Sequence, residues 1–180
     1  DKELACAPFK SLEGSDYYKA MLCAANSAFA NRQIITHRIR ESFSKVFDTK
    51  TENLGIGIVY DVAHNIAKIE RYKINGKEKE VLVHRKGSTR SFGPGRKELP
   101  EIYRNVGQPV IVGGSMQTDS YLLAGTEKAM EDTFGSTMHG AGRTMSRHAA
   151  KKRIRGDQLL KTMAKDGIHV KTASISGLAE

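Results

Sequence analysis

The fold is decided by the stretch IAKIERYKINGKEKEVLVHR, which runs from Ile66 to Arg85. Two runs with strand character, about Ile66–Ile74 and Lys79–Arg85, flank the dipeptide Asn75-Gly76. Both central residues of a type I′ turn need a positive φ, and Asn-Gly meets this need most readily. The stretch therefore predicts an antiparallel β-hairpin.

Upstream of the hairpin, the sequence predicts a long helix followed by a strand. Residues from about Asp16 to Val46 contain neither Pro nor Gly, their apolar positions recur at helical spacing, and Ser15 is a candidate N-cap. This pattern indicates one helix, or two with a break near Asn31. The following segment, Ile56–Val62, is short, β-branched and apolar, which is typical of a buried strand.

Downstream of the hairpin, strands and helices are mixed without a regular βαβ rhythm. Residues 86–108 are loop-like, because Gly93-Pro94-Gly95 and Pro100 interrupt any regular element. The other expected elements are strands at 109–112, 120–123 and 168–173, and helices at about 126–134, 142–155 and 158–165. The fold class is therefore mixed α/β or α+β, and we favour α+β.

Composition limits the class of protein. A chain of 180 residues with 39% hydrophobic residues suits one soluble globular domain. Because no apolar run approaches the length of a membrane span and the start lacks a signal-peptide layout, we expect a cytoplasmic protein without a membrane partner. Cys6 and Cys23 are expected to be reduced thiols. The net charge of +9 favours polyanionic partners, either nucleic acid or a phosphorylated ligand.

The most informative stretch for chemistry is GSTMHGAGR, from Gly135 to Arg143. Its glycines let the backbone approach a ligand closely, and the helix expected to begin there would favour a phosphate at its N-terminus. A neutral imidazole nitrogen of His139 can attack phosphorus and hold the phosphoryl group as a phosphoramidate. The alternative is a histidine that caps a turn. The residues alone leave these two interpretations about even.

Other polar segments carry weaker signals. Four cations recur every four residues and would form one stripe along a helix: Arg143, Arg147, Lys151 and Arg155. Phosphates bound beside the stripe would offset the repulsion between its like charges. The alternative interpretation is a solvated basic face. The segment His84–Arg90 suits either a phosphate-contacting loop or a solvated hairpin end. His64 could bind a metal, but a histidine satisfied in a turn or core is favoured on these residues alone.

Four motifs resemble the RtcB family of RNA-splicing ligases. They are YDVAHNIAK at residues 60–68, VHRKGSTR at 83–90, GQPV at 107–110 and TFGSTMHGAGR at 133–143. Their order and spacing agree across nearly the whole chain. The resemblance implies an RtcB-type α+β fold, with residues 1–180 forming a single segment of the catalytic domain. This segment resembles the later half of the family's chain, without the upstream part that holds most metal ligands and without the C-terminal tail.

The resemblance also implies a reaction and its partners. The family is a GTP-dependent RNA ligase with Mn²⁺ as its metal. GMP would be joined to His139, would then activate an RNA 3′-phosphate, and would be displaced by a 5′-hydroxyl, after any 2′,3′-cyclic phosphate had been opened. The partners implied are GTP and RNA, as tRNA halves in splicing or broken ends in repair, together with possible helper proteins.

The matched positions imply roles for individual residues. His139 would be the catalytic nucleophile and His64 a manganese ligand. The nucleotide would be bound by Asn65, Gly113, Gly114, Ser115, Met116, Ser120, His139, Gly140, Ala141 and Gly142. Phosphates of GTP or RNA would be contacted by Arg143, Arg147, Lys151, Arg85 and Lys86. Gln117 and Asp119 depart from the family's loop, where a Gly and a small residue are expected.

Two functional hypotheses follow from the sequence. In the first, the residues belong to a complete RNA ligase, and the 180 residues alone would take up little or no GMP because His64 cannot hold a metal tightly by itself. In the second, the chain is a metal-free RNA-binding module that uses the basic stripe. The second hypothesis predicts an RNA affinity that falls with salt and with the loss of Arg147 and Lys151.

Overall fold

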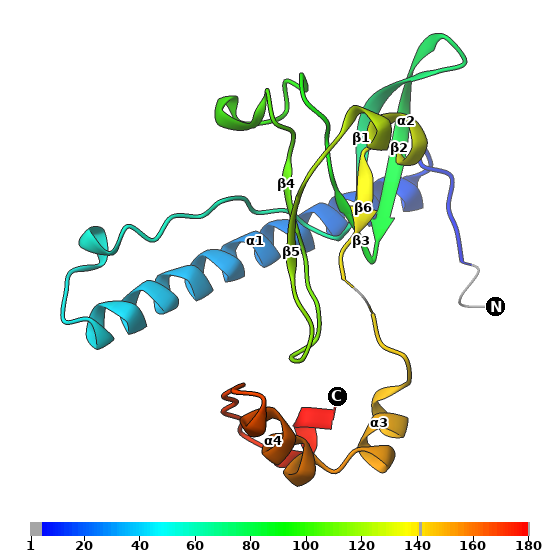
Figure 1. Ribbon diagram of the computed structural model, residues 1–180. Helices are drawn as coiled ribbons and strands as arrows, with labels where there is room; N and C mark the ends of the chain where they lie inside the picture. The colour runs from blue at the N-terminus through cyan, green and yellow to red at the C-terminus, as the bar shows by residue number, and fades with distance from the viewer. Residues whose placement is uncertain (1–4, 141, 180) are drawn as a thin grey trace. The chain divides into compact units, whose positions relative to one another are not determined.

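The computed structural model describes residues 5–140 and 142–179. Figure 1 shows helices and short strands in an α+β arrangement, which confirms the predicted fold class. The α-helices in the described residues are α1 (Leu12–Val46), α2 (Glu127–Thr133), α3 (Arg147–Arg153) and α4 (Gly156–Lys165). The strands are β1 (Asn65–Ile74), β2 (Lys77–Lys86), β3 (Ser88–Arg90), β4 (Pro109–Val112), β5 (Tyr121–Ala124) and β6 (Ser136–Met138). The 3-10 helices are η2 (Thr51–Leu54), η3 (Glu101–Tyr103) and η4 (Ile175–Ala179).

The strands form three two-stranded sheets, β1-β2, β3-β6 and β4-β5. The chain divides into two compact units. Within the described residues, unit 1 contains 5–110 and 124–137, and unit 2 contains 111–123, 138–140 and 142–179. Unit 1 therefore holds α1, the β1-β2 hairpin and α2, whereas α3 and α4 belong to unit 2.

The predicted hairpin is confirmed. β1 pairs with β2 in antiparallel register along its whole length. Asn75 and Gly76 have φ values of 51° and 78°, as a turn with two left-handed residues requires. On the inner face of β1, Tyr72 packs with Phe92 and Leu99 in the core of unit 1. The hairpin thus provides the surface on which the rest of unit 1 is built.

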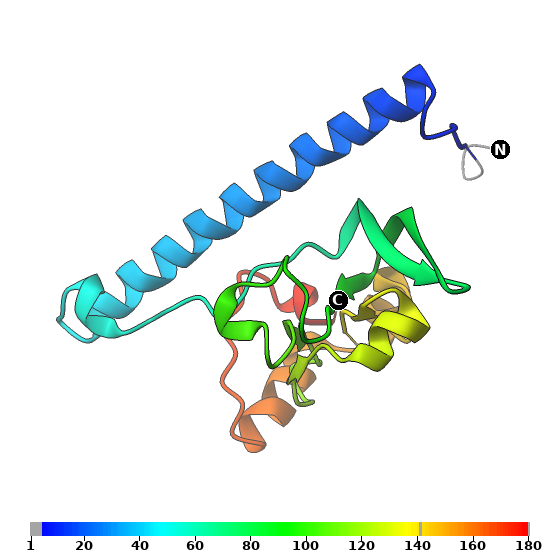
Figure 2. The ribbon, with the colours of Figure 1, turned by 90° about the horizontal axis from the view of Figure 1, so that it is seen from above.

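The long helix is confirmed, but it begins earlier than predicted. Figure 2 shows α1 as one unbroken rod, so the alternative of two helices with a break near Asn31 is wrong. The N-cap is Ser11, whose Oγ accepts a hydrogen bond from the Gly14 N–H at 3.1 Å, and not Ser15. A good N-cap offsets the cost of one glycine in the first turn, since each effect is worth about 1 kcal/mol. The first N–H groups of the helix also need a hydrogen-bond acceptor.

This cap gives a direct test of the helix start. Ser11→Ala should lower the free energy of unfolding by about 1 kcal/mol, because the Gly14 N–H loses its acceptor. Ser15→Ala is the matched control and should change it by less than about 0.5 kcal/mol. Urea unfolding followed by circular dichroism measures both values. Equal losses in the two variants would contradict the assignment of the cap.

Residues 56–62 do not form the buried strand that their composition predicted. The segment is irregular, and Val59 is 55% exposed. Side chains bind its carbonyl groups instead: Arg40 donates to the Ile56 carbonyl at 3.1 Å, and Tyr103 donates to the Val59 carbonyl at 2.8 Å. A strand needs a neighbouring strand for its backbone groups, and none of the strands in the described residues pairs with this segment.

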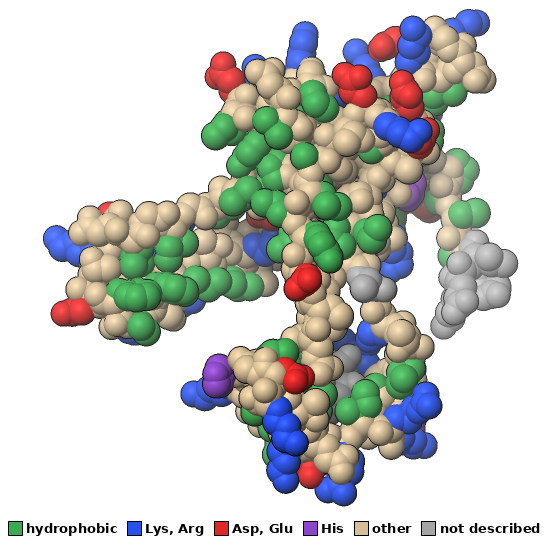
Figure 3. All heavy atoms as spheres, viewed as in Figure 1, with side chains coloured by type: hydrophobic (Ala, Val, Ile, Leu, Met, Phe, Trp, Pro, Cys, Tyr) green, Lys and Arg blue, Asp and Glu red, His purple; other side chains and the backbone are tan. Residues whose placement is uncertain are grey.

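Apolar side chains also remain uncovered on α1. Figure 3 shows them in a row along the visible face of this helix. The exposed apolar side chains of α1 include Ile34, Ile35, Ile39, Phe43 and Val46. None of the helices in residues 5–140 and 142–179 combines the length and apolar character of a membrane span.

The remaining elements match the predictions in part. The strands predicted at 109–112 and 120–123 and the helix predicted at 126–134 are confirmed as β4, β5 and α2, with ends shifted by at most one residue. The helix predicted at 158–165 is confirmed as α4. The segment 86–108, predicted to be a loop, contains β3 and η3. The strand predicted at 168–173 is wrong, because those residues are irregular and pair with no described strand.

Candidate functional site

The segment that carries His139 lies beside the glycine-rich loop 113–120 in unit 2. Gly113 forms an isolated parallel β-bridge with Gly140. The Gly113 N–H donates a hydrogen bond to the carbonyl oxygen of His139 at 3.4 Å, and the His139 side chain is exposed. The structure therefore brings the predicted nucleophile next to two of the residues predicted to bind the nucleotide.

The loop 113–120 is held in shape by its own hydroxyl groups. Ser120 Oγ accepts from the Gly114 N–H at 3.1 Å, and Thr118 Oγ1 accepts from the Ser115 N–H at 2.7 Å. The chain turns so tightly that a Cβ on Gly114 would lie 2.2 Å from a backbone carbonyl oxygen across the loop. Ser115 and Ser120 are thus placed to fix the loop, and the N–H groups of Gly114 and Ser115 already have acceptors within it.

The other residues predicted to bind the nucleotide are spread over both units. Met116, in the loop of unit 2, is 48% exposed. Gly142 follows the histidine segment, whereas Ala141 lies outside the described residues. Asn65 begins β1 in unit 1, where its Oδ1 accepts from the Gly87 N–H at 3.3 Å.

The predicted helix start directly after His139 is wrong. Residues 142–146 are irregular, and α3 begins at Arg147. Ser146 is its N-cap, with Oγ accepting from the Ala149 N–H at 3.2 Å. The predicted helix N-terminus next to His139 is therefore not formed, and the argument from the helix dipole loses its basis.

The predicted basic stripe is also wrong as a continuous helical feature. Only Arg147 and Lys151 lie on α3, while Arg143 precedes it and Arg155 is the N-cap residue of α4. Arg155 forms an ion pair with Asp157 at 3.0 Å. Like charges at four-residue spacing oppose a longer helix, which accounts for the short α3. Figure 3 nevertheless shows Lys and Arg side chains gathered over α3 and α4.

His64 offers one potential metal ligand in unit 1. Its side chain is exposed, and its carbonyl oxygen accepts from the Gly87 N–H at 3.1 Å. The described part of the chain contains no group of three or more His, Cys, Asp or Glu side chains that could hold a metal ion. These residues therefore do not form a complete Mn²⁺ site.

Arg85 and Lys86 have different environments. Lys86 is exposed, as a phosphate contact would require. The Arg85 side chain is 1% exposed, and its Nη1 and Nη2 donate to the two carboxylate oxygens of Glu70 at 2.7 and 2.9 Å. The prediction that Arg85 contacts phosphate is therefore corrected: the guanidinium faces the interior. The signal was present in the sequence, since alternate residues of a strand face opposite sides and His84 and Lys86 both face out.

Sequence reasoning missed Glu70 and Tyr72, which lie on the same inner face of β1. The Tyr72 hydroxyl lies 2.7 Å from Glu70 Oε2 and 2.7 Å from the Phe134 carbonyl oxygen, which are both acceptors for its proton. Burial raises the pKa of Tyr72 far above its ordinary value, and the hydrogen bond to Glu70 raises it further. The hydroxyl is therefore protonated and donates a hydrogen bond at neutral pH.

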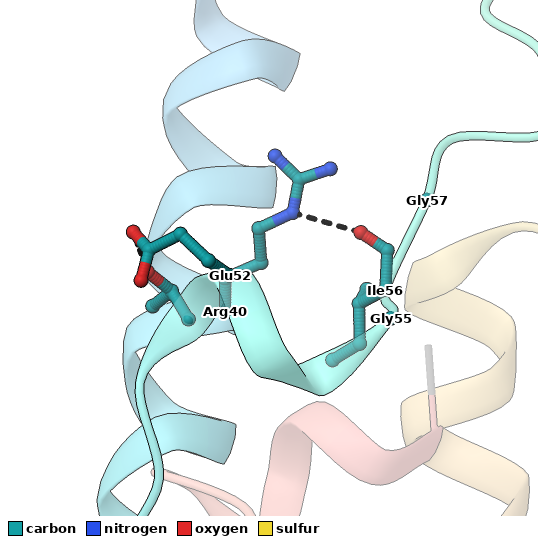
Figure 4. A pocket seen from close by; sticks show the side chains of 6 residues that line it. Arg40, Glu52, Gly55, Ile56 and Gly57 are labelled. Carbon is teal, nitrogen blue, oxygen red and sulfur yellow. Dashed lines mark hydrogen bonds between the residues drawn. The ribbon is translucent and has the colours of Figure 1, made fainter.

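Unit 1 contains an open hollow and a smaller one. An open one of about 370 Å³ is lined by Arg40, Thr51, Glu52, Gly55, Ile56 and Gly57 (Figure 4). A smaller one is lined in part by Asp61, Lys68 and Arg90. There, burial lowers the pKa of Lys68, and the nearby Arg90 charge lowers it further. The lining of the smaller hollow also includes Ala63 and Ile66, which flank His64 and Asn65 in the chain.

Comparison with known proteins identifies the family. The family described as "tRNA-splicing ligase RtcB" matches residues 1–180. The chain belongs to the RtcB family. Its RtcB relatives include proteins named tRNA-splicing ligase RtcB from Archaeoglobus fulgidus and Pyrococcus abyssi, each 56% identical, and from Methanococcus maripaludis, 57% identical. Each match covers 100% of this chain, but 37%, 20% and 38% of the respective relative. The chain thus spans well under half of the length of these curated RtcB relatives, and the resemblance seen in the four motifs is confirmed.

Proposed function

We propose that this chain is the nucleotidyl-transfer part of a GTP-dependent RNA ligase that acts in tRNA splicing or RNA repair. The observation that carries the proposal is the pairing of the His139 segment with the glycine-rich loop 113–120. The segment with His139 lies against the glycine-rich loop through the Gly113–Gly140 bridge, in a chain that matches the RtcB family from end to end. An exposed imidazole beside a tight glycine loop suits attack on a bound nucleotide.

The proposed reaction has three transfers at phosphorus. An imidazole nitrogen of His139 attacks the α-phosphorus of GTP, so that an N–P bond forms, the bond to the β-phosphate breaks, and pyrophosphate leaves. An oxygen of an RNA 3′-phosphate then attacks the same phosphorus and frees the histidine. Finally, a 5′-hydroxyl attacks the RNA phosphorus, loses its proton and displaces GMP. Ends with a 2′,3′-cyclic phosphate would first be hydrolysed to the 3′-phosphate.

The proposal also gives roles to other residues of both units. Ser115 and Ser120 would hold the loop against the nucleotide, with Gly113, Gly114 and Gly140 allowing close approach, and the exposed cations Lys86, Arg143, Arg147 and Lys151 would meet phosphates. Mn²⁺ is proposed as the metal, with His64 as one ligand. The remaining ligands would be residues outside the described part. Since the continuous stripe of a simple RNA-binding module is not formed, ligation is the function supported best.

The proposal is tested by the covalent intermediate. A ligase chain of the relatives' length that carries these residues is incubated with GTP and Mn²⁺, and its intact mass is measured. We expect a gain of one GMP, lost in acid as a phosphoramidate is, and mapped to the peptide with His139. A protein that stays unmodified, or carries GMP elsewhere, would show the proposed chemistry to be wrong.

A further inference from the structure

The buried group formed by Glu70, Tyr72 and Arg85, called here the Glu70–Arg85 clamp, has no place in the chemistry proposed above. Its three side chains come from the two strands of the hairpin. Glu70 and Tyr72 are 7% exposed and Arg85 is 1% exposed. A buried ion pair adds little stability by itself, because both charges lose their hydration. Its contacts therefore indicate another role.

The clamp holds the chain that leads to His139. Arg85 Nη2 donates to the Phe134 carbonyl at 2.7 Å and to the Gly135 carbonyl at 3.4 Å. Arg85 Nε donates to Ser136 Oγ at 2.9 Å. One guanidinium thus contacts three consecutive residues, while its other donors are fixed by the Glu70 carboxylate.

Other contacts hold the same three residues. The Ser91 N–H donates to the Gly135 carbonyl at 2.7 Å. Thr133 Oγ1 donates to the Ser136 carbonyl at 2.7 Å, and the ring of Phe134 packs edge-on against Tyr72 with centroids 5.1 Å apart. The segment 134–136 is therefore anchored from the hairpin, from residue 91 and from the end of α2.

We propose that Arg85 and Glu70 are positioning residues for His139. His139 directly follows β6, whose first residue, Ser136, is bound by Arg85. A strand anchored at its start limits the conformations open to the residues that follow it, so the clamp restricts the backbone of the segment that ends at His139. The proposal rests on the proposed function, because it assumes that His139 is the nucleophile. A misplacement of about 1 Å can cost a reaction about a hundredfold.

The test compares Arg85→Lys with Arg71→Lys in the ligase of full length. Lysine keeps the charge beside Glu70 but cannot form the bidentate pair or reach the same carbonyl groups. Arg71 lies on β1, the partner strand of β2 in the same hairpin, and forms an exposed ion pair with Glu80 at 3.8 Å, so its substitution is the matched control. Two quantities are measured at a temperature where both variants are folded: the rate of GMP transfer to the protein over a range of GTP concentrations, and hydrogen exchange of the peptide covering 134–139.

For Arg85→Lys, we expect the saturated rate to fall by between about tenfold and a hundredfold, while half-saturating GTP changes by less than about threefold. Exchange in 134–139 should quicken by about tenfold. Arg71→Lys should match the parent in both the rate of GMP transfer and the hydrogen exchange of 134–139. A folded Arg85→Lys protein with the parent's rate, or with unchanged exchange, would overturn the clamp proposal.

Two additions keep the test decisive. If Arg85→Lys does not fold, Tyr72→Phe removes a single hydroxyl from the clamp and should give changes in the same direction, by about threefold. Unchanged rate and exchange in that variant would overturn the proposal as well. If the parent takes up no GMP, the proposed function fails, and the exchange measurement still decides whether the clamp orders the histidine segment.

Discussion

A full-length ligase in which His139 is replaced by Ala should form no GMP adduct and seal no RNA. This variant lacks the imidazole nitrogen that is proposed to accept the nucleotidyl group. We expect both activities to fall by about a thousandfold or more, to the limit of detection. Labelling with radioactive GTP measures the first, and gel separation of joined RNA measures the second.

The matched control for this variant is His37→Ala. His37 lies on α1, where Nε2 is 3.4 Å from a Glu41 carboxylate oxygen, and it contacts neither the loop 113–120 nor the segment before His139 in any described interaction. Its loss should leave labelling within about twofold of the parent, as is usual for an exposed side chain. Adduct formation by the His139→Ala protein would place the nucleophile elsewhere.

The second large effect concerns stability. Replacing Arg85 by Met should lower the free energy of unfolding by about 3–5 kcal/mol, because the Glu70 carboxylate would stay buried without its partner. The carbonyl oxygens of Phe134 and Gly135 would lose a donor in addition. Guanidinium-induced unfolding of the full-length protein measures the loss.

Two further variants test whether the loss of stability comes from the buried, unpaired Glu70 carboxylate or from the loss of any arginine on the hairpin. Arg71→Met breaks the exposed pair with Glu80 and should cost less than about 1 kcal/mol. Combining Arg85→Met with Glu70→Leu removes both charges and should recover much of the lost stability. A single Arg85→Met variant that is as stable as Arg71→Met would show that the buried pair does not hold unit 1 together.

The parts of the fold that the sequence predicts well depend on local chemistry. The hairpin follows from Asn75-Gly76, whose positive φ values need no help from distant residues. The end of α2 follows from Gly135, because glycine is favoured just past the end of a helix. β4 and β5 are short apolar runs beside the loop 113–120. Each of these signals lies within about ten residues of the element it defines.

The parts that the sequence predicts poorly depend on partners elsewhere. The apolar residues 56–62 have the composition of a strand, but composition alone does not supply a neighbouring strand. The start of α3 is a different case, because α3 begins after a local cap, Ser146, and not at Gly142 as predicted.

The candidate site also has parts that the sequence predicts well and parts that it predicts poorly. His139 and the loop 113–120 were predicted from their motifs, and the structure brings them together. The burial of Arg85 was missed because a basic residue beside Lys86 was taken for part of an exposed phosphate-contacting loop. Because alternate residues of a strand face opposite sides, an exposed Lys86 predicts that Arg85 faces inward. The same alternation places Glu70 and Tyr72 on the inner face of β1.

The Glu70–Arg85 clamp has a consequence for the order in which the protein folds. Arg85 and Phe134 are 49 positions apart, whereas the hairpin closes over two turn residues. Closing a long chain loop costs conformational entropy before the contacts at its ends stabilise the chain. Elements with local contacts therefore form first. We therefore expect the hairpin to form early and the strand before His139 to be ordered late. The proposed nucleophile, His139, would then be ordered only in chains whose core is already complete, and we expect partly folded molecules to take up no GMP.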